Sequence, residues 1–159
     1  MKVAGDGEYR GETRKNKPHG RGTVVWPDGS RYSGEWQDGN FHGSGIFIWS
    51  NGDKYEGQWK DDRMHGQGTY LFADWRRYEG EWRDDQMHGV GTYYWPSGEK
   101  YEGEFVAGVY EGRGTYIWPD GKIYSKGYIA GNTEIGYQVG CRKTDEKIQG
   151  KGENDKIGK

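Results

Sequence analysis

The sequence has few of the features that a globular enzyme or a membrane protein needs. Hydrophobic residues make up only 31% of its 159 residues, which is low for a domain with a central core. It has four prolines and one cysteine, Cys141, so no internal disulfide can form and a reducing compartment is expected. Apolar runs are short, as at Ile46-Phe47-Ile48-Trp49, which excludes a transmembrane helix. The segment Met1–Arg10 has no apolar stretch, so we expect no signal peptide.

The chain also has almost no excess of charge of either sign. The formal net charge is −2, and acidic and basic residues are interspersed. Without a basic block, neither a nucleic-acid surface nor a strongly anionic-membrane surface is expected. Aromatic residues (16%) and 30 glycines are abundant, however. Disordered chains lack aromatics, and aromatics with glycines favour strands and turns over helices.

Aromatic and glycine residues recur at a fixed interval. A glycine follows each of the first five tyrosines of the series by two positions, and Trp36, Trp59, Trp82 and Phe105 follow by four. Each unit then continues with a G-x-G pair, an aromatic and a turn such as Pro-Asp-Gly or Asn-Gly. The tyrosines are 23 residues apart, at Tyr9, Tyr32, Tyr55, Tyr78, Tyr101 and Tyr124. So many positions kept in phase predict a repeat architecture.

Each unit alternates as two strands do. From Tyr32 to Trp36 the aromatics and the glycine fall on one face, and the other face takes charges. Gly112 to Trp118 is a second strand of the same unit type, and the Pro-Asp-Gly and Asn-Gly turns are hairpin signals because glycine supplies a positive φ. The fold class expected is all-β, an elongated single-layer twisted antiparallel sheet of tandem 23-residue β-hairpins.

The glycines suggest a strand register. Glycine weakens a strand, so its regular use needs a reason, and room for a neighbouring ring is one. We therefore expect large rings to lie opposite glycines or opposite other rings. The expected partners are Trp36 with Gly45, Gly34 with Phe47, Tyr32 with Trp49, Trp49 with Tyr55, Phe47 with Gly57, and Gly45 with Trp59.

The sequence resembles the MORN-repeat family, whose units follow roughly the pattern Y-x-G-x-W-x-x-G-x-x-H-G-x-G. Tyr55 to Gly68 and Tyr78 to Gly91 follow it closely. The resemblance implies the single antiparallel sheet that the strand pattern also predicts. Five repeats are expected in residues 7–123, a degenerate repeat or C-terminal cap in 124–141, and a charged flexible tail, or a segment ordered by a partner, in 142–159.

Some units depart from the pattern. Thr13 replaces Trp in the first unit, Trp75 replaces the turn glycine in the fourth, and Glu111 replaces His in the fifth. After Tyr124 the frame slips by one residue. Terminal repeats are often atypical because they cap the stack, so residues 124–141 are expected either to cap it or to dock a partner.

We find no catalytic, cofactor or metal motif, and we expect no enzyme. Equivalent histidines of successive units lie two strands apart, roughly 10 Å, too far to share one zinc ion. Each is therefore expected to brace its own loop by a hydrogen bond; these are His19, His42, His65 and His88. The G-x-G pairs open strands rather than helices, which argues against a phosphate loop.

The remaining titratable groups have structural interpretations. Glutamates such as Glu56 share a face with basic residues such as Lys54, so solvated pairing along the strands is the simplest account. The thiol of Cys141 has no local histidine and is expected to pack rather than react.

The aromatic face is the candidate interaction surface. A single-layer sheet has no second layer to cover it, and Tyr and Trp are favoured hot-spot residues. The alternative is that the rings only pack against one another as the core of a thin protein. The candidate partner-binding residues are Tyr32, Trp36, Tyr55, Trp59, Tyr78, Trp82, Tyr101, Phe105 and Trp118. The sheet ends offer a second mode, by which a homodimer or docking onto a larger complex would follow.

Two functions compete. The resemblance implies a scaffold or assembly subunit of a ciliary axoneme, as in radial spoke heads, or of another cytoskeletal complex, because the chain has little besides repeats. A cytoplasmic location, at the cytoskeleton or in a cilium, is expected with it. The alternative is a phospholipid-binding or membrane-contact module, against which the charge of −2 argues.

Overall fold

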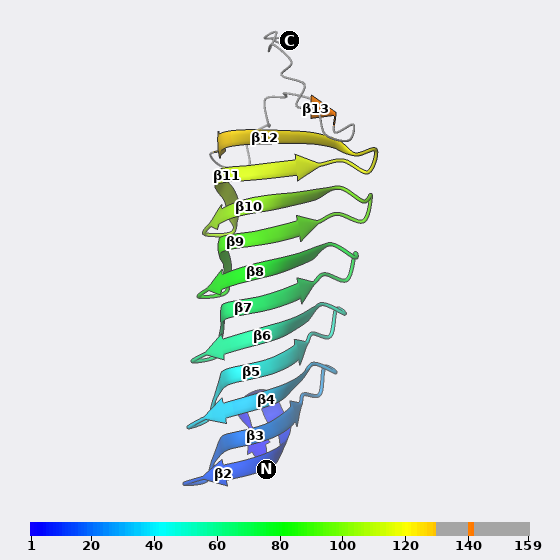
Figure 1. Ribbon diagram of the computed structural model, residues 1–159. Helices are drawn as coiled ribbons and strands as arrows, with labels where there is room; N and C mark the ends of the chain where they lie inside the picture. The colour runs from blue at the N-terminus through cyan, green and yellow to red at the C-terminus, as the bar shows by residue number, and fades with distance from the viewer. Residues whose placement is uncertain (130–139, 142–159) are drawn as a thin grey trace, which may run out of the picture.

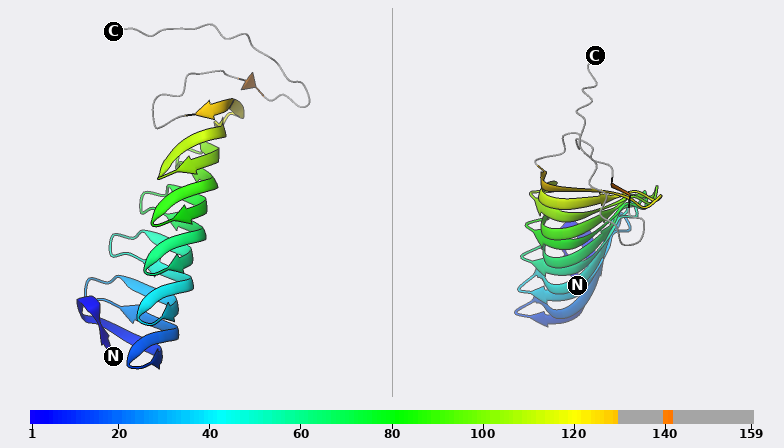
Figure 2. Two further views of the ribbon diagram at one scale, coloured as in Figure 1. Left: turned by 90° about the vertical axis from the view of Figure 1, so that its left-hand side faces the viewer. Right: turned by 45° about the horizontal axis from the view of Figure 1, so that its top comes forward.

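The protein is one antiparallel sheet whose strands follow each other in sequence order. The computed structural model describes residues 1–129 and 140–141. Its strands run from β1 to β13 with every neighbour in space also a neighbour in sequence. They stack as rungs of a narrow ladder (Figure 1), and each rung curves, so the ladder is a bent ribbon and not a flat plate (Figure 2). The expected all-β, single-layer sheet of tandem hairpins is confirmed.

Long and short strands alternate after a short N-terminal strand and one 3-10 turn, Ala4–Asp6. The strands are β1 Lys2–Val3, β2 Gly7–Arg14, β3 Lys17–Val25, β4 Arg31–Gln37, β5 Asn40–Ile48, β6 Lys54–Lys60, β7 Arg63–Leu71, β8 Arg77–Arg83, β9 Gln86–Tyr94, β10 Lys100–Val106, β11 Val109–Ile117, β12 Lys122–Ile129 and β13 Gly140–Cys141. The expected tail, 142–159, lies outside the described residues, as does 130–139 of the expected cap.

Two kinds of turn alternate along the ladder, tight turns at the left of Figure 1 and wider loops at the right. The tight turns have two residues with positive φ, such as Asp61 (50°) and Asp62 (66°), which is the geometry that suits a two-residue hairpin. The wider loops are the Pro-Asp-Gly and Asn-Gly type; in the first, the Gly29 amide donates to the Trp26 carbonyl at 3.0 Å. The sequence pattern predicts the wide loops but not the tight turns.

The expected strand register is wrong. Gly34 pairs with Gly45 rather than with Phe47, and Trp36 pairs with Phe41 rather than with Gly45. Across the next loop Gly45 pairs with Gly57 instead of Trp59. Tyr32 pairs with Phe47 rather than Trp49, Phe47 pairs with Tyr55, and Trp59 pairs with Gly43. Glycine therefore faces glycine across the sheet, at Gly11, Gly22, Gly34, Gly45, Gly57, Gly68, Gly80, Gly91, Gly103 and Gly114.

Rings nevertheless lie over these glycines, because each tyrosine leans along its own strand. A Cβ added to Gly45 would lie 2.3 Å from the Tyr32 hydroxyl oxygen and 2.5 Å from a ring carbon. The Tyr32 hydroxyl donates to the Glu35 carbonyl at 2.8 Å, and Tyr55 and Tyr78 repeat the bond three residues along. The expectation that glycines make room for rings is thus confirmed. The ring belongs to the tyrosine two residues before one glycine of the pair, on the same strand as that glycine.

The core is a row of edge-to-face rings along one face of the sheet. Tyr32 lies between Trp36 and Trp59, with ring centroids 5.2 and 5.5 Å away and interplanar angles of 88° for both. Such contacts add about 0.5–1.5 kcal/mol per pair beyond the burial of area. We call this the inner row; it consists of Tyr9, Tyr32, Trp36, Tyr55, Trp59, Tyr78, Trp82, Tyr101 and Phe105, all buried.

Indole N–H groups tie each unit to the one before it. Trp59 Nε1 donates to the Gly45 carbonyl at 3.2 Å, and Trp36 and Trp82 bond in the same way to Gly22 and Gly68. A tryptophan at this position therefore links the second strand of the preceding unit to the first strand of its own.

Replacing Trp59 with Phe tests this link. We expect Trp59→Phe to lower the free energy of unfolding by about 1–2 kcal/mol, from the lost hydrogen bond and the smaller ring. Urea unfolding followed by circular dichroism measures it. Trp49→Phe, at a partly exposed ring, is the matched control, and an equal loss in both variants would argue against the indole link.

Candidate functional site

A second row of rings lies beside the inner row, next to the wide loops, and keeps part of its surface exposed. Consecutive ring centroids are 4.5–6.2 Å apart, so the row is continuous. All its rings are half-buried except Tyr93, which is 8% exposed. We call this row the outer ladder; it consists of Trp26, Phe47, Trp49, Tyr70, Phe72, Tyr93, Trp95, Tyr116 and Trp118.

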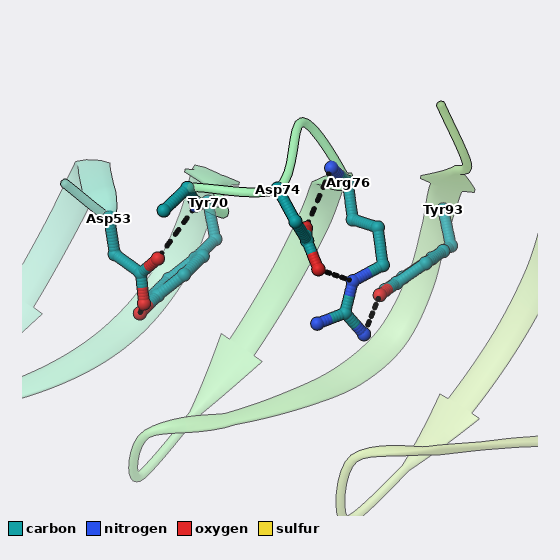
Figure 3. Close-up of polar contacts among 6 residues, drawn as sticks. Asp53, Tyr70, Asp74, Arg76 and Tyr93 are labelled. Carbon is teal, nitrogen blue, oxygen red and sulfur yellow. Dashed lines mark hydrogen bonds and ion pairs between the residues drawn. The ribbon is translucent and has the colours of Figure 1, made fainter. Parts of the chain in front are cut away.

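Polar contacts from the loops fix the rings in the middle of the outer ladder (Figure 3). The Tyr70 hydroxyl donates to Asp53 Oδ2 at 2.8 Å, and the Ala73 amide donates to Asp53 Oδ1 at 2.8 Å. In the next loop Arg76 donates to Asp74 at 2.7 Å and to the Tyr93 hydroxyl at 3.3 Å. The Arg76 guanidinium also lies 4.8 Å from the centroid of the Phe72 ring. Rings held in this way present a preformed surface.

These contacts set the charges at the loops. Partial burial raises the pKa of the Asp53 carboxyl, but hydrogen bonds from the Ala73 amide and the Tyr70 hydroxyl outweigh it and lower the pKa overall. Burial, with the hydrogen bond to Asp53, raises the pKa of the Tyr70 phenol. Asp53 is therefore an anion and Tyr70 a neutral donor near pH 7.

The structure buries eight of the nine residues proposed from the sequence as partner-binding. Tyr32, Tyr55, Tyr78 and Tyr101 are fully buried, and Trp36, Trp59, Trp82 and Phe105 are at most 6% exposed, so these eight belong to the inner row. Trp118 lies in the outer ladder and is half-buried. Most rings of the outer ladder keep some accessible surface, and an aromatic-x-aromatic pattern such as Phe47-Ile48-Trp49 marks them in the sequence. No sequence pattern predicts the hydrogen bond between Tyr70 and Asp53.

Three of the four histidines, His19, His42 and His65, contact the following unit instead of bracing their own loops. His19 Nδ1 accepts a hydrogen bond from the Asp38 amide at 3.3 Å, and Asp38 lies in the next tight turn. His42 Nδ1 lies 3.8 Å from Asp61 and His65 Nδ1 lies 3.9 Å from Asp84, again one unit on. In the described part of the chain, no three His, Cys, Asp or Glu side chains lie where they could hold one metal ion.

Glutamates of the polar face have two roles. Ion pairs run along single strands, between Lys54 and Glu56 at 2.8 Å and between Arg77 and Glu79 at 3.2 Å, as the sequence predicts. Glu81 instead accepts the Val90 amide at 3.1 Å, and Glu12, Glu35, Gln58 and Glu104 do the same at the bulges inside the other four repeats. These four carboxylates and the Gln58 amide oxygen hold the bulges.

The polar face also carries an open groove of about 700 Å³ over the first three units. Arg21 of β3 pairs directly with Glu35 of β4, and Arg10 of β2 and Glu56 of β6 also line the groove. The mixed charges favour no single class of charged ligand.

The first edge of the sheet is partly covered. The chain's amino group donates to the Tyr9 carbonyl at 2.9 Å, and the Tyr9 amide donates to the Met1 carbonyl at 2.7 Å. β1 pairs with β2 only at Gly7 and Glu8. Among the described residues, nothing pairs with the outer side of Arg10–Arg14, so part of this edge remains open to a partner strand.

The geometry matches a known repeat unit by unit. The family model of the MORN repeat matches residues 9–31, 32–54, 55–75, 78–100 and 101–123, and each match contains one first strand, one tight turn and one second strand. The chain belongs to the MORN repeat family. The third match stops at Trp75, so the replaced turn glycine lies in the third repeat and not, as expected from the sequence, in the fourth; the fourth match begins at Tyr78.

Other comparisons are more distant. No curated protein matches this MORN chain in sequence. Among solved structures, it is similar to the TCP domain of Drosophila melanogaster SAS-4 (dCPAP) in complex with a proline-rich motif of Ana2 (dSTIL), with 14% identity over 79% of this chain and 81% of that chain and a TM-score of 0.42. It is also similar to the TCP10 domain of Danio rerio CPAP in complex with a STIL peptide, with 16% identity over 74% and 59% of the two chains and a TM-score of 0.29.

In the part of the chain that the structure describes, no helix is long and apolar enough to cross a bilayer.

Proposed function

We propose that this MORN protein is a non-enzymatic scaffold that binds partner proteins through the outer ladder. The observation that supports it is the row of half-buried rings that runs past every wide loop without a second layer over it. Aromatic side chains offer large contact area at low entropic cost, and they dominate the binding energy of many protein interfaces. MORN repeats are protein-interaction or membrane-binding modules, which fits this proposal.

The finer proposal is a structural or assembly subunit of a ciliary axoneme, of the radial-spoke kind, or of another cytoskeletal complex in the cytoplasm. The repeats occupy most of the chain, so binding along the array is the property that its residues supply. The open part of the first sheet edge adds a second contact, through which a homodimer could form. The eight buried rings proposed from the sequence then act indirectly, by holding the outer ladder in place.

The alternative proposal is a phospholipid-binding or membrane-contact module. Indole and phenol rings suit a membrane interface, and the outer ladder provides both. Against it stand the acidic residues of the wide loops beside these rings, since anionic lipids attract cations.

Co-sedimentation separates these proposals. We expect the full chain to pellet with demembranated axonemes, and Trp95→Ala to weaken that binding about tenfold, as truncation of an aromatic anchor costs about 1–2 kcal/mol. Val90→Ala is the control, because Val90 is a 62% exposed apolar residue on the polar face. Salt-sensitive pelleting with phosphatidylserine vesicles, with no pelleting on axonemes, would instead support the membrane-contact alternative.

A further inference from the structure

Trp75 occupies a loop position at which the other wide loops have glycine. The equivalents are Gly29, Gly52, Gly98 and Gly121, with φ between 83° and 95°. Trp75 adopts the same left-handed region, with φ 71°, and its amide donates to the Phe72 carbonyl at 3.0 Å as the glycines do in their loops. A bulky residue in this region is strained, and the loop forms without it in four other units. The loop geometry therefore does not require tryptophan.

The Trp75 side chain is also the most exposed large hydrophobic group described. It is 74% exposed, whereas the rings of the outer ladder beside it are half-buried. Figure 3 shows the backbone between Asp74 and Arg76 arching away from the strands. Strain that is kept at an exposed aromatic residue favours a binding role over a folding role.

Carboxylates recur in the same row of loops as this residue. The five wide loops hold Asp28, Asp53, Asp74, Glu99 and Asp120 against one basic residue, Arg76, and Lys122 follows the fifth loop as the first residue of β12. Both basic side chains pair with an aspartate of these loops. Asp53 accepts hydrogen bonds from Tyr70 and Ala73, and Glu99 accepts one from Ser97, and these donors are uncharged. The loop row therefore keeps an excess of negative charge on both sides of the Trp75 loop.

Neighbouring loops lie close enough to act together. A Cβ at Gly52 would lie 3.6 Å from the Ala73 Cβ, and Arg76 reaches the Tyr93 hydroxyl of the next unit. The cations that follow the second, third and fourth loops do not cancel the charge, because Lys54, Arg77 and Lys100 are paired with Glu56, Glu79 and Glu102 along the strands. Arg31 follows the first loop, two loops away from Trp75.

We propose that Trp75 anchors an extended basic segment of a partner protein, whose lysine or arginine side chains stack on the indole and pair with Asp53 and Glu99. A cation over an indole face is attracted by its quadrupole, and carboxylates on either side set the register of successive cations. The same carboxylates would repel an anionic membrane. This inference rests on the proposed scaffold function and names its partner chemistry and its anchor.

The test uses the full chain and three labelled peptides of equal length in which lysine, glutamate or glutamine alternates with proline, which keeps them extended. We expect the lysine peptide to bind at least tenfold more tightly than the other two, and the binding to weaken as salt rises. Equal affinity for the three peptides, or no binding of the lysine peptide, would overturn the proposal.

Substitutions at Trp75 separate binding from folding. Trp75→Gly relieves the strain, so we expect Tm to rise by about 2–4 °C. The same variant is expected to lose at least tenfold in affinity for the lysine peptide. Trp75→Ala keeps the strain and removes the indole, so it should lose the affinity without the gain in Tm. Unchanged affinity in both variants would overturn the anchor role.

Two further results keep this inference distinct from the scaffold proposal. If Trp95→Ala weakens binding to axonemes while Trp75→Gly leaves the lysine-peptide affinity unchanged, the anchor fails and the scaffold function stands. If Trp75→Gly abolishes binding to phosphatidylserine vesicles but not to the lysine peptide, the partner is a membrane surface and the basic-segment proposal is wrong.

Discussion

Raising the pH above 10 is expected to unfold this protein cooperatively. Burial raises the pKa of the inner-row phenols of Tyr32, Tyr55 and Tyr78 far above 10, and that of Tyr101 to about 12. Nearby carboxylates, such as Glu35 beside Tyr32 and Glu104 beside Tyr101, add to the effect. The phenolate is thus disfavoured in the folded state and is free to form in the unfolded one.

The sign follows from linkage. A phenol whose pKa is raised by folding contributes stability that is fully present below the unfolded pKa of about 10 and is lost as the pH rises toward the folded pKa. Each such group removes about 1.4 kcal/mol per pH unit in that window, so four remove roughly 5 kcal/mol per unit. Against a typical total of about 5–15 kcal/mol, unfolding is expected about one to three pH units above 10.

Phenolate absorbance and far-ultraviolet circular dichroism, followed together during an alkaline titration, measure this effect. We expect most of the phenolate signal to appear in the same narrow pH interval in which the strand signal disappears. Tyr32→Phe removes one titrating group, so its stability should fall less steeply with pH by about 1.4 kcal/mol per unit. Phenolate formation over a broad range with an intact strand signal would show that the inner row is open to solvent.

The period, the hairpins and the buried face follow from the sequence because alternation is a local property. Tyr32, Gly34 and Trp36 fall on one face whatever they pair with, and burial of Tyr32 and Trp36 confirms that face. Register is not local. Two glycines per unit allow either ring-on-glycine or glycine-on-glycine pairing, and the structure adopts the second because Tyr32 covers Gly45 while its hydroxyl bonds the Glu35 carbonyl.

The candidate site was harder to predict for a related reason. Alternation places both rows of rings on one face, but it does not say which row is covered, since that depends on contacts between units. Trp36 is covered because its indole reaches the Gly22 carbonyl of the preceding unit, whereas Trp49 stands at the start of a wide loop. Trp75 is visible in the sequence as a departure from the repeat, but its exposure and its φ are known only from the structure.

The row of paired glycines makes a second large effect accessible to experiment. Gly57 is not in the left-handed region, so an alanine there meets no backbone strain of its own. Its Cβ would, however, lie 2.5 Å from the Gly68 Cα, 2.6 Å from the Gln67 carbonyl oxygen and 2.6 Å from the Tyr55 hydroxyl oxygen. Two of these three atoms are backbone atoms of the neighbouring strand, which cannot turn aside as a flexible side chain could.

Gly57→Ala is therefore expected to lower the free energy of unfolding by about 3 kcal/mol or more, at or beyond the upper end of overpacking effects. Urea unfolding monitored by circular dichroism measures the loss. Gly121→Ala is the matched control: no atom lies within 4 Å of its Cβ position, and its φ of +83° predicts a cost of only about 1–2 kcal/mol. Because the same close approach recurs at Gly34, Gly80 and Gly103, substitution there should cost a similar amount. If Gly57→Ala loses no more free energy of unfolding than Gly121→Ala does, the strands can move apart at the glycine row while the sheet stays intact.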